Sequence, residues 1–252
     1  MERGYSHALN IRRMNATTKQ DFGAFLAYID SYSLSGISND PAKVAHVRLA
    51  HAQFLGLLTV AAELLSDSGS VRDEFESSYG GPGKRYFGEV VSDCSEFVMC
   101  VLQGLCRSAG GTLRSGIESY LKAFSAVEQP LILRRTSVPE VFNDAAGTAF
   151  FSTVVGKKVL SDLRTVYSEL NFYVHTASQA QMFGALAVGS FPRWSDKNEG
   201  LIDLFVRAVR LFLYGAVGSR RDFFDQFDYR NKVIVNRSMT RQQRRLAMGV
   251  ED

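Results

Sequence analysis

Leu160-Ser-Asp-Leu-Arg-Thr-Val-Tyr-Ser-Glu-Leu-Asn-Phe-Tyr-Val-His-Thr176 is the stretch that decides the fold, because its helical periodicity is the clearest in the chain. At 100° per residue its apolar side chains form one arc: Leu160, Leu163, Tyr167, Leu170 and Val174. A second, wholly polar arc lies beside it, here called the polar row: Arg164, Ser168, Asn171 and His175. Phe172 lies on the far side of the polar row, so we expect the row to be part-buried. An unsatisfied buried polar group costs roughly 1–3 kcal/mol, so the row either forms a structural network or lines a site.

Length and composition are those of an ordinary globular protein. The 252 residues are 46% hydrophobic and 22% charged, which suffices for one large domain or two small ones. Cys94, Cys100 and Cys106 are an odd number in one predicted helix, and their spacing scatters them around it. That favours neither a disulfide framework nor a metal site, and it fits a reducing cytoplasm. We expect a soluble intracellular protein, because there is no signal-peptide pattern and no uncharged apolar run near the roughly 20 residues that span a bilayer.

Charge is distributed unevenly along the chain. The formal net charge is +3, but Tyr229–Asp252 alone carries six basic and two acidic residues, a net +4. The first 228 residues therefore sum to −1. We expect attraction for an anionic partner to be concentrated in the last 24 residues.

Residues 41–65 carry the strongest helix start signal. Asp40 can cap the free backbone amides, and Pro41 suits the first helical position because it has no amide to satisfy. The apolar face predicted for this helix contains Val44, Val47, Phe54, Leu55, Leu58, Ala62 and Leu65. His51 falls within that face. It is either a core histidine bonded to a neighbouring helix or a residue that faces His175 or Arg164 across a site.

The remaining chain also indicates helices. We predict a helix from Thr17 or Thr18, a linker over 66–86, a helix over 87–107 stopped by Gly110-Gly111, and a following helix capped by Thr112. Residues 131–135 could be a short extended piece, 176–189 an interior helix, and 201–214 a central core helix. Lys232-Val-Ile-Val is the one strand candidate. The glycine-rich turn Tyr79-Gly-Gly-Pro-Gly-Lys-Arg85 lacks the residues of a phosphate-binding loop.

The predicted fold class is therefore all-α, an irregular bundle of roughly eight to ten helices. We predict one helical domain over residues 1–228, in which residues 1–16 form a loose arm. A basic C-terminal segment over 229–252 follows it.

Residue types that carry catalysis are scarce. There are four histidines, dispersed acidic residues, and no Cys-x-x-Cys, His-Glu-x-x-His, Gly-x-Ser-x-Gly or dinucleotide motif. We therefore expect no metal and no cofactor. The polar row remains, because imidazole serves as a general acid or base near neutral pH and arginine stabilises a phosphoryl oxyanion. Those groups suit metal-independent RNA cleavage, with His175, Arg164 and Asn171 as the catalytic candidates and His51 as a further one.

Leu170-Asn-Phe-Tyr-Val-His175 resembles the Leu-Ser/Asn-x-Tyr-Val-His signature of bacterial helical proteins and, more broadly, HEPN-like domains. Many such domains are RNases of toxin and antiphage systems. The resemblance covers about 15 residues. In the usual HEPN motif an arginine is followed by a polar residue, with four to six residues in total before the histidine. Here Arg164 precedes His175 by eleven, and Asn171 is the nearest substitute for a motif position. The resemblance implies a helical architecture, a defence-type context and a site that is commonly completed across a dimer, for which Glu169 and Tyr173 are interface candidates.

The basic C-terminal segment is the second functional candidate. Arg237, Arg241, Arg244 and Arg245 would share one face of a short helix, and arginines on such a face can contact phosphates or an acidic protein surface. The alternative is a solvated charged tail. The nucleic-acid-binding candidates are Arg230, Lys232, Arg237, Arg241, Arg244 and Arg245.

Three functional hypotheses follow. The favoured one is a non-catalytic accessory module that binds RNA, DNA or a partner protein through its basic C-terminus, because the charge asymmetry is explicit. The second is an RNase-like effector built on the polar row. The third is a structural, oligomeric helical protein in which the row is a buried network. We also expect a homo- or hetero-oligomer and no membrane association.

Overall fold

The computed structural model describes residues 35–174 and 193–248. Every regular element in those two ranges is helical, and eight of the helices contain at least eight residues. The all-α prediction is confirmed. The predicted N-terminal arm, the helix from Thr17 or Thr18, the helix over 176–189 and His175 itself lie outside the described residues.

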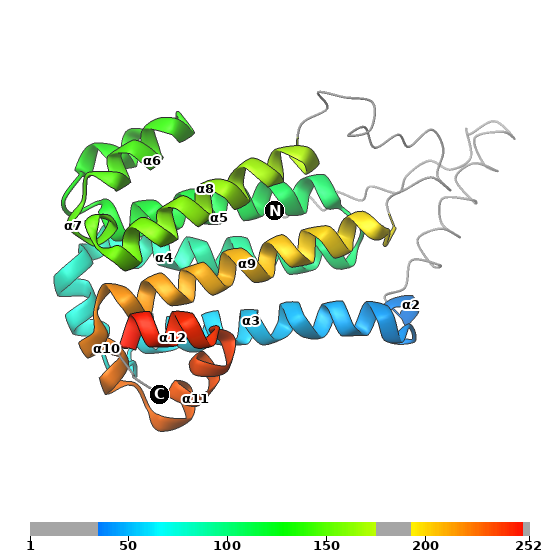
Figure 1. Cartoon of the computed structure of the whole chain (residues 1–252), viewed down its shortest axis with the longest axis horizontal. Coiled ribbons are helices and arrows are strands. Elements are labelled where there is room, and N and C mark those ends of the chain that lie inside the picture. The colour runs from blue at the N-terminus through cyan, green and yellow to red at the C-terminus, as the bar shows by residue number, and fades with distance from the viewer. Residues whose placement is uncertain (1–34, 175–192, 249–252) are drawn as a thin grey trace, which may run out of the picture.

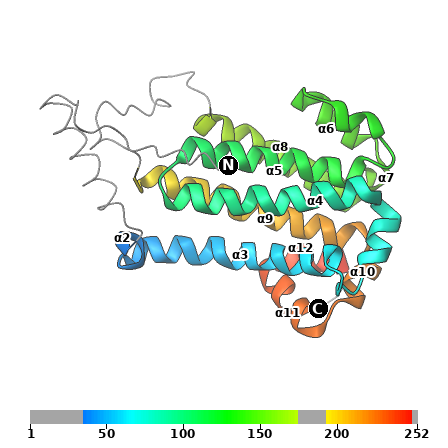
Figure 2. The same ribbon diagram turned by 180° about the vertical axis from the view of Figure 1, so that it is seen from behind.

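Five long helices form the body of the bundle (Figure 1): α3 (Pro41–Leu65), α4 (Arg72–Leu102), α5 (Cys106–Ser125), α8 (Val154–Val174) and α9 (Asp196–Ser219). Viewed from behind, α4 and α5 lie side by side in front of α9 (Figure 2). The short elements join or cover the long ones: α2 (Ser35–Ser38), η2 (Pro130–Arg134), α6 (Val138–Ala146), α7 (Ala149–Ser152), α10 (Arg221–Gln226), α11 (Tyr229–Ser238) and α12 (Arg241–Met248).

Helix α9 is the centre of the bundle, as its nearly all-round apolar sequence predicts. It packs against α3, α4, α5, α8, α11 and α12. Two stacked aromatic pairs join it to α4 and α5: the ring centroids of Phe97 and Phe205 lie 4.5 Å apart, and those of Tyr120 and Phe212 lie 4.7 Å apart. A Cβ atom at Gly215 would come within 2.1 Å of the Tyr120 hydroxyl. Only glycine therefore lets α5 and α9 approach this closely.

The apolar arc predicted for residues 160–170 and the helix cap predicted at Asp40 are both present in the structure. Leu160, Leu163, Tyr167 and Leu170 are buried along one side of α8. Asp40 caps α3, since its Oδ1 accepts from the backbone N–H groups of Ala42 (3.0 Å) and Lys43 (3.3 Å). Both predictions are confirmed.

The predicted buried face of α3 is wrong. Leu55 and Leu58 are 41% and 40% exposed and His51 is exposed, whereas Leu57, Val60 and Leu64 are buried. This helix is apolar on most sides, so periodicity alone does not select a face. The smallest residues of α3 determine which of its sides packs against the bundle. At Gly56, for example, a Cβ atom would come within 2.5 Å of the Ser238 hydroxyl on α11.

The predicted linker over 66–86 is also wrong, because α4 begins at Arg72 and runs through the glycine-rich turn. Gly80 adopts a left-handed conformation (φ 68°), which glycine tolerates, and kinks the helix. Pro82 then lies in the first turn after the kink, where a missing amide is harmless.

The next helix boundary differs for a similar reason. Helix α4 ends at Leu102, Gly104 (φ 75°) makes the turn, and α5 runs through Gly110-Gly111 and Thr112, which were expected to stop one helix and cap the next. A Cβ atom at Gly110 would lie 3.2 Å from the side chains of Tyr173 and Val174, so this glycine serves the packing of α8. Two smaller expectations are wrong as well: residues 131–133 lie in the 3-10 helix η2, and 232–235 lie in α11.

The C-terminal helices are held to the bundle by specific bonds. The Glu63 carboxylate on α3 accepts hydrogen bonds from the backbone N–H of Asp228 (3.1 Å), the side-chain amide of Asn231 (2.6 Å) and the Ser70 hydroxyl (2.7 Å). Burial raises the pKa of Glu63, but these bonds outweigh it and leave the pKa below the ordinary value. The Ser238 hydroxyl lies 3.3 Å from the Ala52 carbonyl oxygen, to which it donates.

By length and composition alone, α3 could cross a membrane. Of its most apolar 18-residue window, 39% is buried against the rest of the bundle. Core helices of soluble bundles share both properties, so this observation assigns no membrane role.

We predict that Glu63→Gln lowers the free energy of unfolding by about 1–3 kcal/mol, because it removes the charge that accepts these bonds. Chemical denaturation near neutral pH measures the loss. Since the pKa of Glu63 is lowered, its contribution is present above the unfolded pKa and disappears as pH falls through the folded value, so the two proteins should converge in acid. The exposed Glu74→Gln is the matched control, expected to change stability by less than about 0.5 kcal/mol. Equal effects of the two changes would contradict the assignment.

A second prediction concerns Asp93 on α4, whose Oδ2 is buried without a hydrogen-bond partner among the described residues. Burial raises its pKa to about 6, and Glu89 and Glu96 add to the rise. The ionised form therefore destabilises the fold above that pH, and protonation removes the cost as pH falls. Asp93→Asn should raise the free energy of unfolding by about 1 kcal/mol near pH 8. This value is smaller than the pKa shift alone would give, because solvent screens the half-exposed carboxyl. Below about pH 4 the substitution should change nothing. A constant gain across this range would show that ionisation is not the cause.

Candidate functional site

A pocket of about 430 Å³ opens between α5, α6 and α8. Its lining residues are Arg114, Val138, Pro139, Phe142, Asn143, Arg164, Tyr167, Ser168 and Asn171. We call it the arginine pocket. None of its lining residues is acidic, and apolar side chains alternate with arginine and amide groups.

Three members of the polar row line this pocket. Arg164 and Ser168 are exposed and Asn171 is half-buried, one helical turn apart along α8. The structure thus brings Arg164 and Asn171 together, as the sequence predicted. His175, the fourth member, is outside the described residues.

His51 does not belong to this site. It is exposed on α3, and α9 lies between α3 and α8 (Figure 1). The core-histidine interpretation is wrong, because His51 is exposed, and His51 does not face Arg164. His175, the other residue that His51 was predicted to face, lies outside the described residues. The error follows from the wrong choice of buried face on α3.

Two aromatic rings hold the two arginines of the pocket. Arg114 stacks on the ring of Tyr167 at 4.4 Å from its centroid, and its Nη2 donates to the Tyr167 hydroxyl at 2.6 Å. The Tyr167 hydroxyl in turn donates to Glu118 Oε1 at 2.9 Å. Arg164 lies over the ring of Phe142 at 5.2 Å, and that ring meets Tyr167 edge to face at 5.9 Å. The guanidiniums therefore flank a fixed pair of rings.

Burial and the neighbouring Glu118 raise the pKa of Tyr167 to about 12, although the Arg114 guanidinium acts in the opposite direction. The phenol therefore stays protonated at physiological pH. It acts as a fixed link between Arg114 and Glu118 and is no candidate for a general base.

Asn171 is the unsatisfied group of the pocket. Its Oδ1 atom is buried and has no hydrogen-bond partner among the described residues. A buried polar atom without a partner is costly, so this amide either awaits a ligand or pairs outside the described ranges.

The basic C-terminal candidates divide into two groups. Lys232 Nζ donates to the Asp225 carbonyl oxygen at 2.6 Å, and Arg244 Nη1 donates to the carbonyl oxygens of Asn236 (2.8 Å) and Met239 (2.9 Å). These two side chains fasten the C-terminal helices internally. The shared face predicted for Arg244 is therefore wrong. Arg230, Arg237, Arg241 and Arg245 are exposed.

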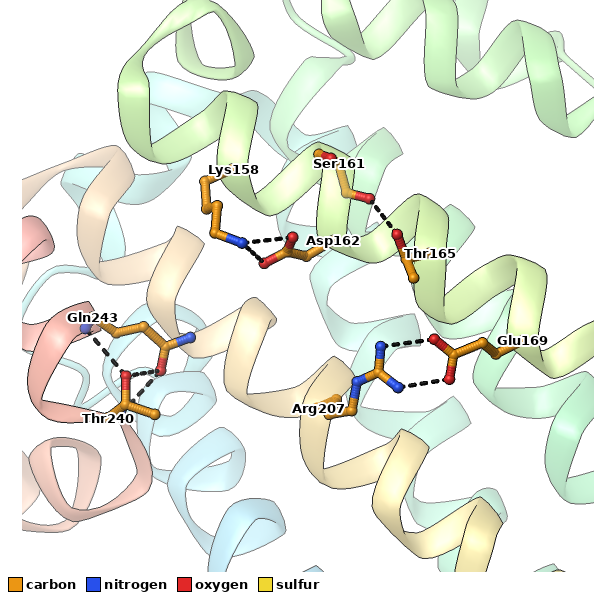
Figure 3. Close-up of polar contacts among 8 residues, drawn as sticks. All are labelled: Lys158, Ser161, Asp162, Thr165, Glu169, Arg207, Thr240 and Gln243. Atoms are coloured by element: carbon orange, nitrogen blue, oxygen red, sulfur yellow. Dashed lines mark hydrogen bonds and ion pairs between the residues drawn. The ribbon is translucent and has the colours of Figure 1, made fainter.

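A second hollow of about 310 Å³ lies between α8, α9 and the start of α12 (Figure 3). Its polar groups are mostly paired within the chain. Arg207 makes two bonds to the Glu169 carboxylate (2.6 and 2.9 Å), Lys158 donates to Asp162 (2.7 Å), and Thr240 donates to Gln243 (3.1 Å). Two of its three charged lining residues, Arg207 and Asp162, are thus bound by oppositely charged side chains, and Arg210 Nε donates to the Ser238 carbonyl oxygen at 3.4 Å.

Glu169 and Tyr173, the interface candidates, both face α9. Glu169 is bound by Arg207, and a Cβ atom at Gly200 would come within 2.4 Å of the Tyr173 hydroxyl. Glu169 is nevertheless exposed, and the oligomer interface expected at these residues stays a prediction.

Among the described residues, no group of three or more histidine, cysteine, aspartate or glutamate side chains could hold a metal ion. Cys94 and Cys106 are buried and Cys100 is half-buried, all as free thiols. Burial raises the pKa of Cys94 far above its usual range, so its thiol is unreactive.

Comparisons with protein-family models, curated proteins and solved structures find no significant match. The helical architecture that the HEPN-like resemblance implies is present. The family assignment itself stays a prediction.

Sequence reasoning missed Arg114, Asn143 and the apolar residues of α6. The one signal for Arg114 was its i,i+4 spacing to Glu118, which is common on solvated helix faces. Its place in the pocket depends on how α5 packs against α8.

We predict that Tyr167→Phe lowers the free energy of unfolding by about 1–2 kcal/mol, because Arg114 and Glu118 both lose a half-buried hydrogen-bond partner. Thermal or chemical denaturation measures the change. Tyr229→Phe is the matched control, since Tyr229 is 77% exposed and should tolerate the loss of its hydroxyl. A neutral Tyr167→Phe would show that the hydroxyl link adds nothing to the fold.

Proposed function

We propose that this protein is a non-catalytic helical module that binds nucleic acid through exposed arginines of α11 and α12. The observation that carries the proposal is the composition of residues 229–248, which hold six basic side chains and no acidic one. Arg230, Arg237, Arg241 and Arg245 are exposed there. Phosphate contacts by arginine supply most of the sequence-independent affinity for nucleic acid.

The attachment of α11 and α12 to the bundle also supports this proposal. Glu63, Asn231 and Ser238 join α11 to α3, and Arg244 joins the start of α12 to the end of α11. The exposed arginines therefore stand on a fixed scaffold, which reduces the conformational entropy lost when they bind.

The biological setting is part of the proposal and comes from the resemblance of residues 170–175 to HEPN-like bacterial proteins. We infer an accessory role in a bacterial assembly of the antiphage type, in which the module contributes binding and another component contributes catalysis.

A metal-independent ribonuclease is the second candidate, favoured by the presence of Arg164 and Asn171 in one pocket. It requires His175 as the acid or base. Cleavage of labelled RNA that His175→Ala abolishes, with the thermal melting temperature unchanged, would replace the first proposal by this one.

The test of nucleic-acid binding uses fluorescence anisotropy with labelled single-stranded RNA and DNA at two salt concentrations. We predict that the pair Arg237→Glu and Arg245→Glu weakens binding at least about tenfold near 0.1 M salt and flattens its salt dependence. Point changes are preferable to deletion of residues 229–252, because deletion would uncover Glu63 and Gly56 of the core.

The matched control is the pair Arg85→Glu and Arg134→Glu, which changes the net charge equally at exposed positions outside α11 and α12. It should retain near wild-type affinity. Equal weakening by both pairs would reduce the effect to net charge, and absence of binding by the wild type would overturn the proposal.

A further inference from the structure

The arginine pocket contains a positively charged group, the Arg164 guanidinium, whose N–H groups do not help to hold the helices together. Arg164 makes no hydrogen bond or ion pair with a described residue, and its contact with Phe142 is through the face of the guanidinium. A stacked guanidinium keeps its in-plane N–H groups free, and these match the oxygens of a carboxylate or phosphate. Arg114 adds a second positive charge at the other end of the ring pair. The pocket is therefore built for an anion.

Apolar surface accompanies these charges. Val138, Pro139 and Phe142 of α6 line the pocket beside the Tyr167 ring. A bare inorganic anion would gain nothing from this wall, whereas a flat ring would bury it and release water. The volume of about 430 Å³ also exceeds what a single small anion fills.

The Asn171 amide is the third feature of the pocket, after the arginines and the apolar wall, that indicates a ligand. Its buried Oδ1 lacks a hydrogen-bond donor among the described residues, and it lies one helical turn from Ser168 in the same lining. A hydroxyl or amino substituent on the ring would satisfy it, and a buried acceptor that gains a donor no longer bears the cost of an unmade hydrogen bond.

We propose that the pocket between α5, α6 and α8 binds a small aromatic anion: one carboxylate or phosphate group on a flat ring that also carries a hydrogen-bond donor. Arg164 holds the anionic group with support from Arg114. The ring lies along the α6 wall, and Asn171 accepts from the donor. This site is separate from α11 and α12, so the inference does not rest on the proposed nucleic-acid binding.

The hollow between α8, α9 and α12 is a poorer site for such a ligand, because Arg207 is already bound by Glu169 and Asp162 lines it (Figure 3). The Glu169 carboxylate neutralises Arg207, and the lining residue Asp162 adds a negative charge that an anion would meet. The arginine pocket has no acidic lining residue, and this difference is what selects it.

The test is isothermal titration of the full chain with four probes: 4-hydroxybenzoate, 4-hydroxyphenyl phosphate, inorganic phosphate and phenol. The first two separate carboxylate from phosphate as the anionic group, and the last two isolate the anion and the ring. We expect at least one aromatic anion to bind about tenfold or more tightly than either isolated half.

Arg164→Ala should weaken that probe at least about tenfold, whereas Arg134→Ala, at an exposed arginine outside the pocket, should leave its affinity unchanged. Ser168→Trp is the second variant: Ser168 is exposed, so tryptophan should fill the pocket and abolish binding while the melting temperature stays within a few degrees.

Binding that survives both Arg164→Ala and Ser168→Trp would overturn the assignment. So would inorganic phosphate that binds as tightly as the aromatic anions, or no binding by any probe at millimolar concentration. Nucleic-acid binding by α11 and α12 can succeed or fail independently, because the variants expected to weaken binding in the two tests share no residue, and Arg134 serves only as a control position in both.

Discussion

The burial of α9 is the constraint on which the rest of this structure depends. Its side chains are apolar around most of the helix, so water must be excluded from nearly every side of it. No single neighbour can do this. The chain surrounds α9 with α3, α4, α5 and α8, and adds α11 and α12 where those helices leave it uncovered. The arrangement of the whole bundle follows from enclosing one helix.

Enclosing α9 also determines where polar groups can gather. One side of α8 packs against α9. Arg164, Ser168 and Asn171 lie on another side of α8, toward α6. The short helix α6 lies along only part of α5 and α8 (Figure 1). The arginine pocket lies between these three helices. The pocket thus arises at the edge of the core, where apolar walls and hydrated charges meet.

The sequence predicted α8 and α9 well because each has one unambiguous pattern, an amphipathic stripe in the first and apolar residues nearly all round in the second. It failed on α3, where apolar side chains surround the helix and small residues such as Gly56 decide what packs there. It failed again at Gly80, Gly104 and Gly110, since a glycine that ends a helix, kinks it or admits a neighbour looks the same in sequence. The arginine pocket was half predictable: Arg164 and Asn171 share a helix face, but Arg114 and Phe142 join them only through tertiary packing.

The bonds from α11 to α3 have a consequence for biosynthesis. Ser238 reaches Ala52 across 186 residues of chain, and Asn231 reaches Glu63 across 168. Such distant contacts form late, because a long loop must close first. When α3 leaves the ribosome, α11 has not yet been synthesised, so the side of α3 that α11 covers is exposed. The nascent chain therefore exposes this surface of α3 until α11 has been made and has packed against it.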